Sequence, residues 1–377
     1  MKKYKLGDLL SEFHAGKAIQ TENIKNKGAY PVYGGNGQRG YTDSYNQDGE
    51  YLIIGRQGAY CGNVRYNIGK AYLTEHAIVG QTREDHNPIY IALKLSLMKL
   101  SQLQGQSAQP GLSVNTLSCI SMEMPPKEIQ DKIADIMLKL DRKIELNRQI
   151  NDNLEAMAKQ LYEYWFVQFD FPNEEGKPYK SSGGAMVWNE KLKREIPQGW
   201  NILPISDILD KYPTTKRYET KEYLQIGKYP IIDQGDAYIV GFTNENDNLL
   251  TRHPAVLFGD HSTKVKFLDF DFARGADGTQ ILYSSNDAVS QYYLYLVVSA
   301  LQIPNPGYSR HFKYLKELPI VIPSLSIATK FVNIVKPLFE KWTKNIFNNI
   351  ALTKQRDELL PLLMNGQASV NYHLSAC

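Results

Sequence analysis

A long amphipathic segment, residues 125–165, constrains the fold of this chain more than any other feature. Its apolar residues recur at steps of mostly three and four, which keeps them on one helical face; they are Ile129, Ile133, Ile136, Leu140, Ile144, Ile150, Leu154, Met157, Leu161 and Trp165. At 1.5 Å per residue, about 37 such residues span about 55 Å, more than the width of a small domain. The pattern predicts a rod-like helix, interrupted in its stripe only at Asn147, whose apolar face needs a second helix.

A similar segment lies 198 positions later, at residues 323–363. Seven apolar positions coincide at this offset, which indicates an internal repeat. The residues we expect to pair the two helices are Ile129, Ile133, Ile136, Leu140, Ile144, Leu154, Leu161, Ile327, Phe331, Ile334, Leu338, Trp342 and Leu352. Pro337 and Pro361 lie inside the second copy, and each removes a backbone donor. A kink or a helix start is therefore expected near Pro337.

The repeat extends to the segments that precede the helices, at an offset near 200. Tyr30-Pro31-Val32 resembles Tyr229-Pro230-Ile231, Ile54-Gly55 resembles Phe258-Gly259, and Pro110-Gly111 lies close to where Pro306-Gly307 falls. The order is globule, helix, globule, helix, in the α+β class, with the two helices packing on each other as a coiled-coil-like spacer. We expect globules at 1–124 and 200–322, helices at 125–166 and 323–366, a linker at 167–199 and a frayed tail at 367–377.

Composition narrows the class of protein without deciding its function. A length of 377 residues favours two or more domains. Hydrophobic content of 42% and charged content of 22% are ordinary for a soluble globular chain. A net charge of +3 is compatible with nucleic-acid binding and equally with a mildly basic protein of another kind. The 25 tyrosines supply many amphipathic rings that suit a recognition surface.

Neither the cysteines nor the apolar runs point to export. Cys61, Cys119 and Cys377 are widely spaced and match no zinc or redox motif, which favours a reducing cytoplasm. The first residues contain no signal-type apolar core, and no 18-residue apolar run follows. We therefore expect a cytoplasmic protein that does not span a membrane.

The first globule carries a glycine-rich run at residues 30–45. Gly35, Gly37 and Gly40 match the spacing of a dinucleotide fingerprint, but no helix follows and no βαβ unit frames them, so that interpretation is set aside. Arginine and glutamine side chains read guanine and adenine edges, and several stand beside these glycines. The candidates for nucleic-acid contact are Gln38, Arg39, Arg56, Gln57 and Arg65. The alternative for each is an ordinary exposed hairpin tip.

The second globule repeats the framework with different loop residues, as two modules that read different targets would. Asp260, His261 and Ser262 cannot form a catalytic triad, because three adjacent residues do not generally point at one another. His311 is expected to meet a phosphate or solvent rather than a metal, since no second ligand stands at a suitable spacing. The candidates for nucleic-acid contact here are Lys264, Lys266, Arg274, Arg310, His311 and Lys313.

The segment between the globules, residues 165–200, is rich in proline, glycine and serine and has no period. This composition predicts a linker. Its aromatic residues Trp165, Phe166, Phe169 and Phe171 are expected to pack on the end of the first long helix.

Taken together, these segments resemble a known family, the specificity subunits of type I restriction-modification systems. The resemblance covers nearly the whole chain and rests on the helix at 124–166, the following WFVQFDFPNEEGKPYKSSGG, the doubled globule and helix order, and the run at 30–45. It implies that the globules are target recognition domains. It also implies that antiparallel helices hold them apart, so that each reads one half of a bipartite, asymmetric sequence in double-stranded DNA.

The resemblance further implies that this chain has no catalytic centre and binds no cofactor or metal itself. Methyltransferase subunits, expected as two copies, would bring S-adenosylmethionine and adenine methylation. Restriction subunits would bring ATP, Mg²⁺ and cleavage. The chain lacks both an Asn-Pro-Pro-aromatic methyltransferase motif and a GxxxxGK[ST] phosphate loop.

The residues by themselves support the same hypothesis. Half-sites on one face of B-DNA recur about every 34 Å, so a rod of about 55 Å can carry two modules about one turn apart. Two other hypotheses remain open from the sequence. One is a protein-binding helical scaffold or adaptor without DNA readout, which predicts no salt-dependent DNA affinity. The other is an enzyme that uses the loops of one globule, which the missing motifs disfavour.

Overall fold

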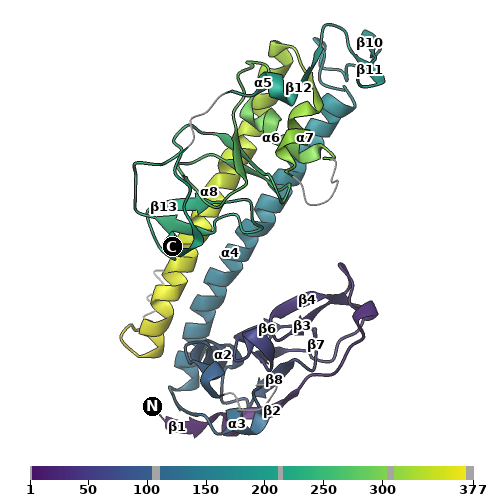
Figure 1. Ribbon diagram of the computed structural model, residues 1–377. Helices are drawn as coiled ribbons and strands as arrows, with labels where there is room; N and C mark the ends of the chain where they lie inside the picture. The colour runs from purple at the N-terminus through teal and green to yellow at the C-terminus, as the bar shows by residue number, and fades with distance from the viewer. Residues whose placement is uncertain (1, 104–110, 211–214, 304–309, 371–377) are drawn as a thin grey trace, which may run out of the picture. The chain divides into compact units, whose positions relative to one another are not determined.

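The computed structural model describes residues 2–103, 111–210, 215–303 and 310–370 (Figure 1). The chain divides into two compact units, Met1–Glu145 with Asn349–Cys377, and Leu146–Asn348. We call them unit 1 and unit 2 and describe each by itself. Pro110 of the first Pro-Gly pair, the Pro306-Gly307 pair and the end of the tail lie outside the described residues.

Unit 1 contains the first globule, built from short strands and three short α-helices. Its elements are β1 (Lys2–Lys5), α1 (Leu6–Leu9), β2 (Leu10–Ala15), β3 (Tyr30–Gly34), β4 (Gly37–Thr42), β5 (Glu50–Gly55), β6 (Val64–Ile68), β7 (Tyr72–Leu73), β8 (Ala77–Thr82), α2 (Pro88–Ser96), α3 (Val114–Ser118) and β9 (Ser121–Met124). The sheets have the strand orders β2-β8-β5-β6, β4-β3-β7 and β1-β9. Strand β5 is apolar on both faces and buried from Tyr51 to Gly55, because α2 packs against it.

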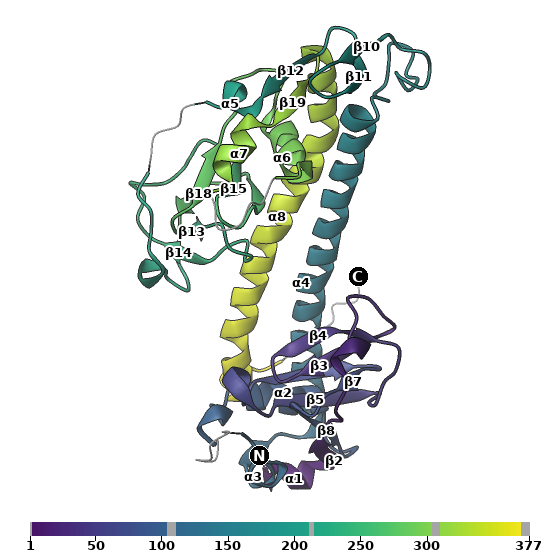
Figure 2. The same ribbon diagram turned by 45° about the vertical axis from the view of Figure 1, so that its right-hand side comes forward.

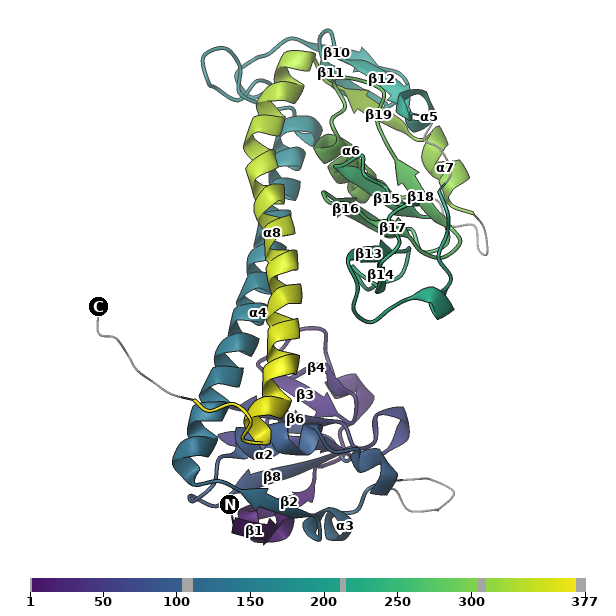
Figure 3. The same cartoon turned by 90° about the vertical axis from the view of Figure 1, so that its left-hand side faces the viewer.

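Unit 2 contains the second globule and the segment that leads to it. Its elements are β10 (Met186–Asn189), β11 (Arg194–Pro197), β12 (Asn201–Pro204), α5 (Ile205–Ile208), β13 (Tyr229–Ile232), β14 (Gly241–Thr243), β15 (Ala255–Gly259), β16 (Val265–Leu268), β17 (Ala273–Arg274), β18 (Thr279–Leu282), α6 (Gln291–Ala300), α7 (Phe312–Glu317) and β19 (Pro319–Ile322). Figure 3 shows α6 beside the sheet that contains β15, β16 and β18.

The internal repeat holds at the level of strand pairing. Strand β3 pairs antiparallel with β4 and parallel with β7, and β13 pairs in the same two ways with β14 and β17. Strand β5 lies between β6 and β8, as β15 lies between β16 and β18. The first strand of each globule pairs with the strand that precedes the long helix, β1 with β9 and β12 with β19. The predicted α+β class and the duplication are both confirmed.

Two long helices, α4 (Lys127–Tyr162) and α8 (Leu325–Met364), contribute to both units. In unit 1 a polar group joins them to the globule. Tyr66 on β6 donates its hydroxyl to Asp141 at 2.5 Å, and Arg356 on α8 forms an ion pair with the same carboxylate at 2.9 Å. Burial raises the pKa of Tyr66, so its hydroxyl remains a donor at neutral pH. Asn349 also donates to the carbonyl oxygen of Ile144 at 3.1 Å.

In unit 2 the helices meet through asparagines and then through aromatic rings. Asn345 is buried and donates to Asn151 Oδ1 at 2.9 Å, while Asn151 donates to the carbonyl oxygen of Trp342 at 3.1 Å. Toward the end of α4 the contacts become apolar, with the Trp165 and Phe331 rings 5.5 Å apart. Figures 1 and 2 both show α4 and α8 side by side in this unit. Contacts run in opposite order along the two helices, which is antiparallel packing.

The expected pairing residues fall into three groups. Ile133, Ile144, Ile327 and Phe331 are buried, whereas Ile136, Leu140, Leu154, Leu161, Leu338, Trp342 and Leu352 are half-buried. Ile129 and Ile334 are 40% and 44% exposed, so their assignment to the seam is wrong. In each case the neighbour one position on is buried instead: Gln130 contacts Asn87 and His86 of the first globule, and Val335 lies in the apolar core of unit 2.

Pro337 and Pro361 neither start nor end a helix. Helix α8 is continuous from Leu325 to Met364 and contains both prolines, with Pro337 exposed. Each proline lacks the N–H that would donate to the carbonyl oxygen four residues earlier. The ring of Pro337 faces away from the buried side of α8, where the helix continues without a break. The expected helix start at Pro337 is therefore wrong.

The segment predicted as a linker is folded. It starts as a π-helical turn, Glu163–Val167, and continues to the hairpin of β10 and β11. The Phe171 and Trp200 rings stack 5.0 Å apart, and the Arg194 guanidinium lies 4.6 Å from the Phe169 ring centre. Trp165, Phe166, Phe169 and Phe171 are all buried, which confirms their expected packing on the helix end.

The asparagine pair of unit 2 gives a stability prediction. Replacement Asn345→Ala leaves the buried Asn151 oxygen without its donor and should lower the unfolding free energy by about 1–3 kcal/mol. All four tryptophans lie in unit 2, so tryptophan fluorescence during urea unfolding reports on this unit. Asn348→Ala, at an exposed position of the same helix, is the control and should change the free energy by less than about 0.5 kcal/mol. Equal losses in the two variants would contradict the role of the buried pair.

Candidate nucleic-acid interface

Three loops of the first globule meet at one end of its sheets. They follow β3 (residues 34–37), follow β5 (residues 55–60) and precede β8 (residues 74–76). The backbones approach so closely that a Cβ on Gly55 would lie 2.4 Å from the carbonyl oxygen of Tyr60 and 2.7 Å from that of Gly35. Only glycine fits there. The glycine-rich run therefore serves to pack backbone on backbone, and we call this end tip 1.

Polar side chains surround tip 1. Gln38 and Arg39 are exposed on β4, and Arg56 is half-buried with Nη1 at 3.5 Å from the carbonyl oxygen of Glu75. The Gln57 Oε1 lies 3.3 Å from Nδ1 of His76, within hydrogen-bond distance. The structure thus brings the first-globule candidates together on one end, as a base-reading surface requires.

Arg65 has a structural contact in addition to its exposure. Its Nη2 donates to the carbonyl oxygen of Asn36 at 3.2 Å. Gly37 has φ of +101°, and a Cβ there would lie 2.8 Å from the Arg65 Cζ. The guanidinium therefore rests on the turn between β3 and β4 and holds it in place. Together with Tyr33, Asp141, Arg356 and neighbouring side chains, Arg65 lines a hollow of about 350 Å³.

The second globule has the same three loops, joined by one glutamine. Gln234 follows β13, donates through Nε2 to the carbonyl oxygen of Asp277 at 2.7 Å and accepts from the His261 N–H at 2.9 Å. Ser262 donates its hydroxyl to the Gln234 carbonyl at 2.6 Å. We call this end tip 2. It confirms that the framework is repeated while the side chains differ.

Three second-globule candidates are buried, which corrects the expectation that they reach a ligand. Lys266 is 7% exposed and donates to the carbonyl oxygens of Asp233 and Ala237, at 2.8 and 2.5 Å. Arg274 is 7% exposed and donates to the carbonyl oxygen of Thr215. His311 is 4% exposed with Nδ1 at 2.9 Å from the Asp260 carbonyl oxygen. These side chains support loops, whereas Lys264, Arg310 and Lys313 are exposed.

Lys266 and Arg65 occupy equivalent places in the repeat. Each comes directly after the valine that pairs with the end of the central strand, Val64 with Ile54 and Val265 with Phe258. Each cation donates to a main-chain carbonyl of the loop that follows β3 or β13. Burial lowers the pKa of Lys266. A long basic side chain at this position is therefore part of the framework in both globules.

The Asp260-His261-Ser262 sequence is not a catalytic centre. The Asp260 carboxylate accepts the N–H of Phe312 at the start of α7, at 2.8 Å, and the Ser262 hydroxyl is engaged with Gln234. His261 is exposed. Across residues 2–103, 111–210, 215–303 and 310–370 there is no group of three His, Cys, Asp or Glu side chains that could hold a metal ion.

Two residues of the tips were missed by sequence reasoning, His76 and Gln234. Neither stands within a glycine motif that resembles a known site. An alignment of the two globules by the repeat offset would have pointed to Gln234. It lies in the loop after β13, which corresponds to the glycine-rich loop after β3 in the first globule.

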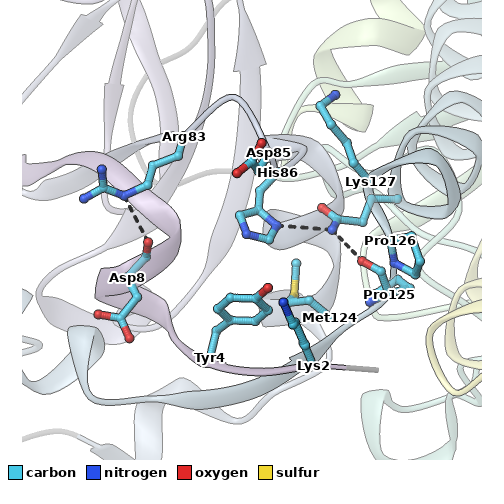
Figure 4. A pocket seen from close by; sticks show the side chains of 11 residues that line it. Lys2, Tyr4, Asp8, Arg83, Asp85, His86, Met124, Pro125, Pro126 and Lys127 are labelled. Carbon is cyan, nitrogen blue, oxygen red and sulfur yellow. Dashed lines mark hydrogen bonds between the residues drawn. The ribbon is translucent and has the colours of Figure 1, made fainter.

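A larger hollow of unit 1, about 620 Å³, lies at the start of α4 (Figure 4). Gln130 is fully buried there, donates to the carbonyl oxygen of Pro125 at 2.8 Å and accepts from the Asn87 N–H at 3.0 Å. Burial lowers the pKa of His86, whose ring packs edge-on against Tyr4. No residue of tip 1 lines this hollow, so we assign it to the junction of globule and helix.

Comparison with known proteins identifies the family. Residues 1–156 and 197–352 match the family described as "Type I restriction modification DNA specificity domain", and the two segments together cover well over half of the chain. The chain belongs to this family. The predicted family is thus confirmed, and the chain is a DNA-specificity subunit rather than a catalytic one. No described helix combines the length and apolar character of a membrane span.

Individual relatives agree with this assignment. The type I restriction enzyme EcoprrI specificity subunit of Escherichia coli is 41% identical over 144 residues, which are 37% of this chain and about a third, 36%, of that subunit. The MjaIX specificity subunit of Methanocaldococcus jannaschii is 28% identical over 377 residues, covering 88% of this chain and 84% of the relative. A type I S subunit crystal structure from M. genitalium has the same fold, with a TM-score of 0.62 at 18% identity over 96% of this chain and 95% of that one.

The buried lysine of tip 2 can be tested by stability. Lys266→Met keeps the apolar stem but leaves two carbonyl oxygens without a donor, so it should lower the unfolding free energy of unit 2 by about 1–3 kcal/mol. Urea unfolding followed by tryptophan fluorescence measures this. The matched control is Lys264→Met two residues earlier, at an exposed side chain, with an expected change within about 0.5 kcal/mol. A destabilisation by the control as large as by Lys266→Met would argue against the loop-supporting role.

Proposed function

We propose that each globule of this specificity subunit reads one half of a bipartite, asymmetric DNA target. Residues 1–124 and 200–322 are the two target recognition domains, and the helices at 125–166 and 323–366 are the spacer. The observation that carries the proposal is the repeated loop framework with different side chains, because two halves of an asymmetric target require one scaffold with two chemistries. The candidates for DNA contact that are not buried are Gln38, Arg39, Arg56, Gln57 and Arg65 at tip 1, and Lys264, Arg310 and Lys313 beside or after tip 2.

The subunit acts through partners in this proposal. Methyltransferase subunits bring S-adenosylmethionine and methylate adenine in the target, and restriction subunits bring ATP, Mg²⁺ and cleavage. Two methyltransferase copies match the two-fold repetition of the chain, since each repeat presents an equivalent surface. The complex acts on DNA in the cytoplasm. A protein-binding scaffold without DNA readout is the contrary outcome of the experiments below.

The spacer helix sets the scale of the target. Helix α4 alone has 36 residues, which corresponds to about 54 Å. That length exceeds the roughly 34 Å between half-sites that lie one turn of B-DNA apart. We therefore expect the gap between the half-sites to depend on the length of the paired helices.

Methylation mapping tests the proposed function. Long-read sequencing of DNA from cells that contain this chain and its cognate methyltransferase subunit should show adenine methylation at a two-part motif with a fixed gap. Cells with the methyltransferase subunit alone are the control and should lack the motif. An intact, active complex that produces no motif dependent on this chain would favour the scaffold.

Shortening the spacer tests the role of its length. Deleting Glu145–Asn151 from α4 together with Lys344–Ile350 from α8 removes two turns from each helix, about 10 Å, and rotates the ends by only about 20°. The methylated motif should keep both halves with a gap shorter by about three base pairs, at 3.4 Å each.

The control for this deletion keeps the helix length. The deletion removes Asn147, Asn151, Asn345 and Asn349, so the matched variant replaces these four residues with leucine without shortening either helix. It should methylate the original motif. A shortened protein that folds and still recognises the original gap would show that helix length does not set the target.

A further inference from the structure

The exposed cations at the two tips differ in their surroundings. Among the described residues, no carboxylate lies within ion-pair distance, 4.0 Å, of Arg39, Arg56 or Arg65 at tip 1. Arg56 and Arg65 donate to main-chain carbonyl oxygens, which leave their positive charge uncompensated. Tip 1 therefore presents three arginines whose charge is available to an approaching anion.

Tip 2 and its surroundings pair their cations with carboxylates. Lys264 lies 2.9 Å from Asp236, and this hydrogen bond lowers the pKa of the Asp236 carboxyl. Arg217 forms an ion pair with Asp277 in the loop that Gln234 holds. Lys216 contacts Glu245 at 3.0 Å and Glu222 at 3.2 Å. Each of these three cations therefore has a carboxylate close by, whereas the exposed Arg310 and Lys313 have none within 4.0 Å among the described residues.

The whole globules show the same difference. Residues 1–124 contain 13 Lys and Arg against 10 Asp and Glu, a net charge of +3. Residues 200–322 contain 12 against 14, a net charge of −2. DNA attracts a protein largely through phosphate neutralisation and the release of counterions. A carboxylate that remains beside a cation repels the same phosphates, so paired cations contribute less to this attraction.

We propose that the first globule supplies most of the electrostatic attraction to the duplex, and that the second, with a net negative charge and several paired cations, supplies less of it. This inference rests on the proposed function and adds a division of roles between the modules. Arg39 and Arg56 supply phosphate contacts at tip 1. At tip 2 the side chains of Gln234 and Ser262 hold the loops together, and the exposed cations outside an ion pair are Arg310 and Lys313. The second module therefore acts on a duplex that the first has already captured.

The salt dependence of DNA binding separates the two modules. The complex of this chain with its methyltransferase subunits is titrated with a duplex that carries its mapped motif, at several salt concentrations. In the double variant Arg39→Gln, Arg56→Gln, the slope of log affinity against log salt should fall in magnitude by about 2, at about 0.9 per lost phosphate contact. Arg65 is left unchanged because it supports the turn at Asn36.

The matched control is the double variant Lys216→Gln, Arg217→Gln in the second globule, at two cations that are not among the candidates for DNA contact. It removes the same number of cations, and because these cations are engaged by carboxylates rather than by phosphates, the slope should not fall by more than about a quarter of the tip 1 effect. Circular dichroism of both variants verifies that each is folded. A fall as large as that of the tip 1 variant would overturn the division of roles.

A second measurement uses duplexes in which one half of the motif is scrambled. At 200 mM salt, on a duplex that keeps only the first-module half, the tip 1 variant should lose more affinity relative to the wild-type complex than the second-globule control variant does. The reverse order would overturn the proposal. A wild-type complex that binds its motif no better than a fully scrambled duplex would instead contradict the proposed function itself, so the two failures are distinguishable.

Discussion

Close contact of backbone with backbone at the tips is the constraint on which the recognition surface depends. At tip 1 the carbonyl oxygens of Gly35 and Tyr60 occupy the space that a side chain on Gly55 would need. Buried backbone groups have to be paired, and here the Gly62 N–H donates to the carbonyl oxygen of Gly55 at 2.8 Å. Main-chain contacts hold the loops together with a few side chains, Arg65, Gln234 and Lys266, so the other outward side chains contribute little to the stability of the tips. They can therefore differ between the two globules while the framework remains the same.

Polar contacts, rather than apolar area alone, orient each globule on its part of the long helices. In unit 1 the Asp141 carboxylate receives both Tyr66 and Arg356, and in unit 2 Glu155 accepts the Tyr295 hydroxyl at 2.7 Å. Burial of such groups costs desolvation that the pairing roughly offsets, so their net contribution to stability is small. They fix the orientation of each globule on its part of the helices, since a hydrogen bond between fixed partners permits one orientation where an apolar contact permits several. A globule that reads DNA with a rigid tip requires a fixed orientation.

The sequence predicted the large features of the fold because these depend on local period and on duplication. The two long helices follow from apolar steps of three and four, and the strand pairings repeat wherever residues such as Tyr30-Pro31 and Tyr229-Pro230 recur. The spacing of apolar residues alone, however, does not show which of them on a broad helical face are buried by neighbouring elements. Ile129 and Ile334 are therefore exposed although they keep the spacing. Likewise, the packing of the aromatic residues on the helix end was predictable, but the β10–β11 hairpin in the segment at 167–199 was not, because its proline- and glycine-rich composition is equally typical of a linker.

The sequence predicted basic and amide side chains in the loops of each globule, but not which of them are exposed. The reason is that tertiary contacts decide which charged side chains are buried. Lys266 and Arg274 carry the same charge as Lys264, yet tertiary contacts bury the first two and leave the third exposed. A net charge of +3 for the whole chain conceals a positive first globule and a negative second one. Electrostatic attraction acts over about 8–10 Å in physiological salt, so the local balance around each tip, and not the total, decides what DNA experiences. In a duplicated chain, net charge indicates affinity for DNA only when it is counted for each repeat separately and the ion pairs formed in the fold are taken into account.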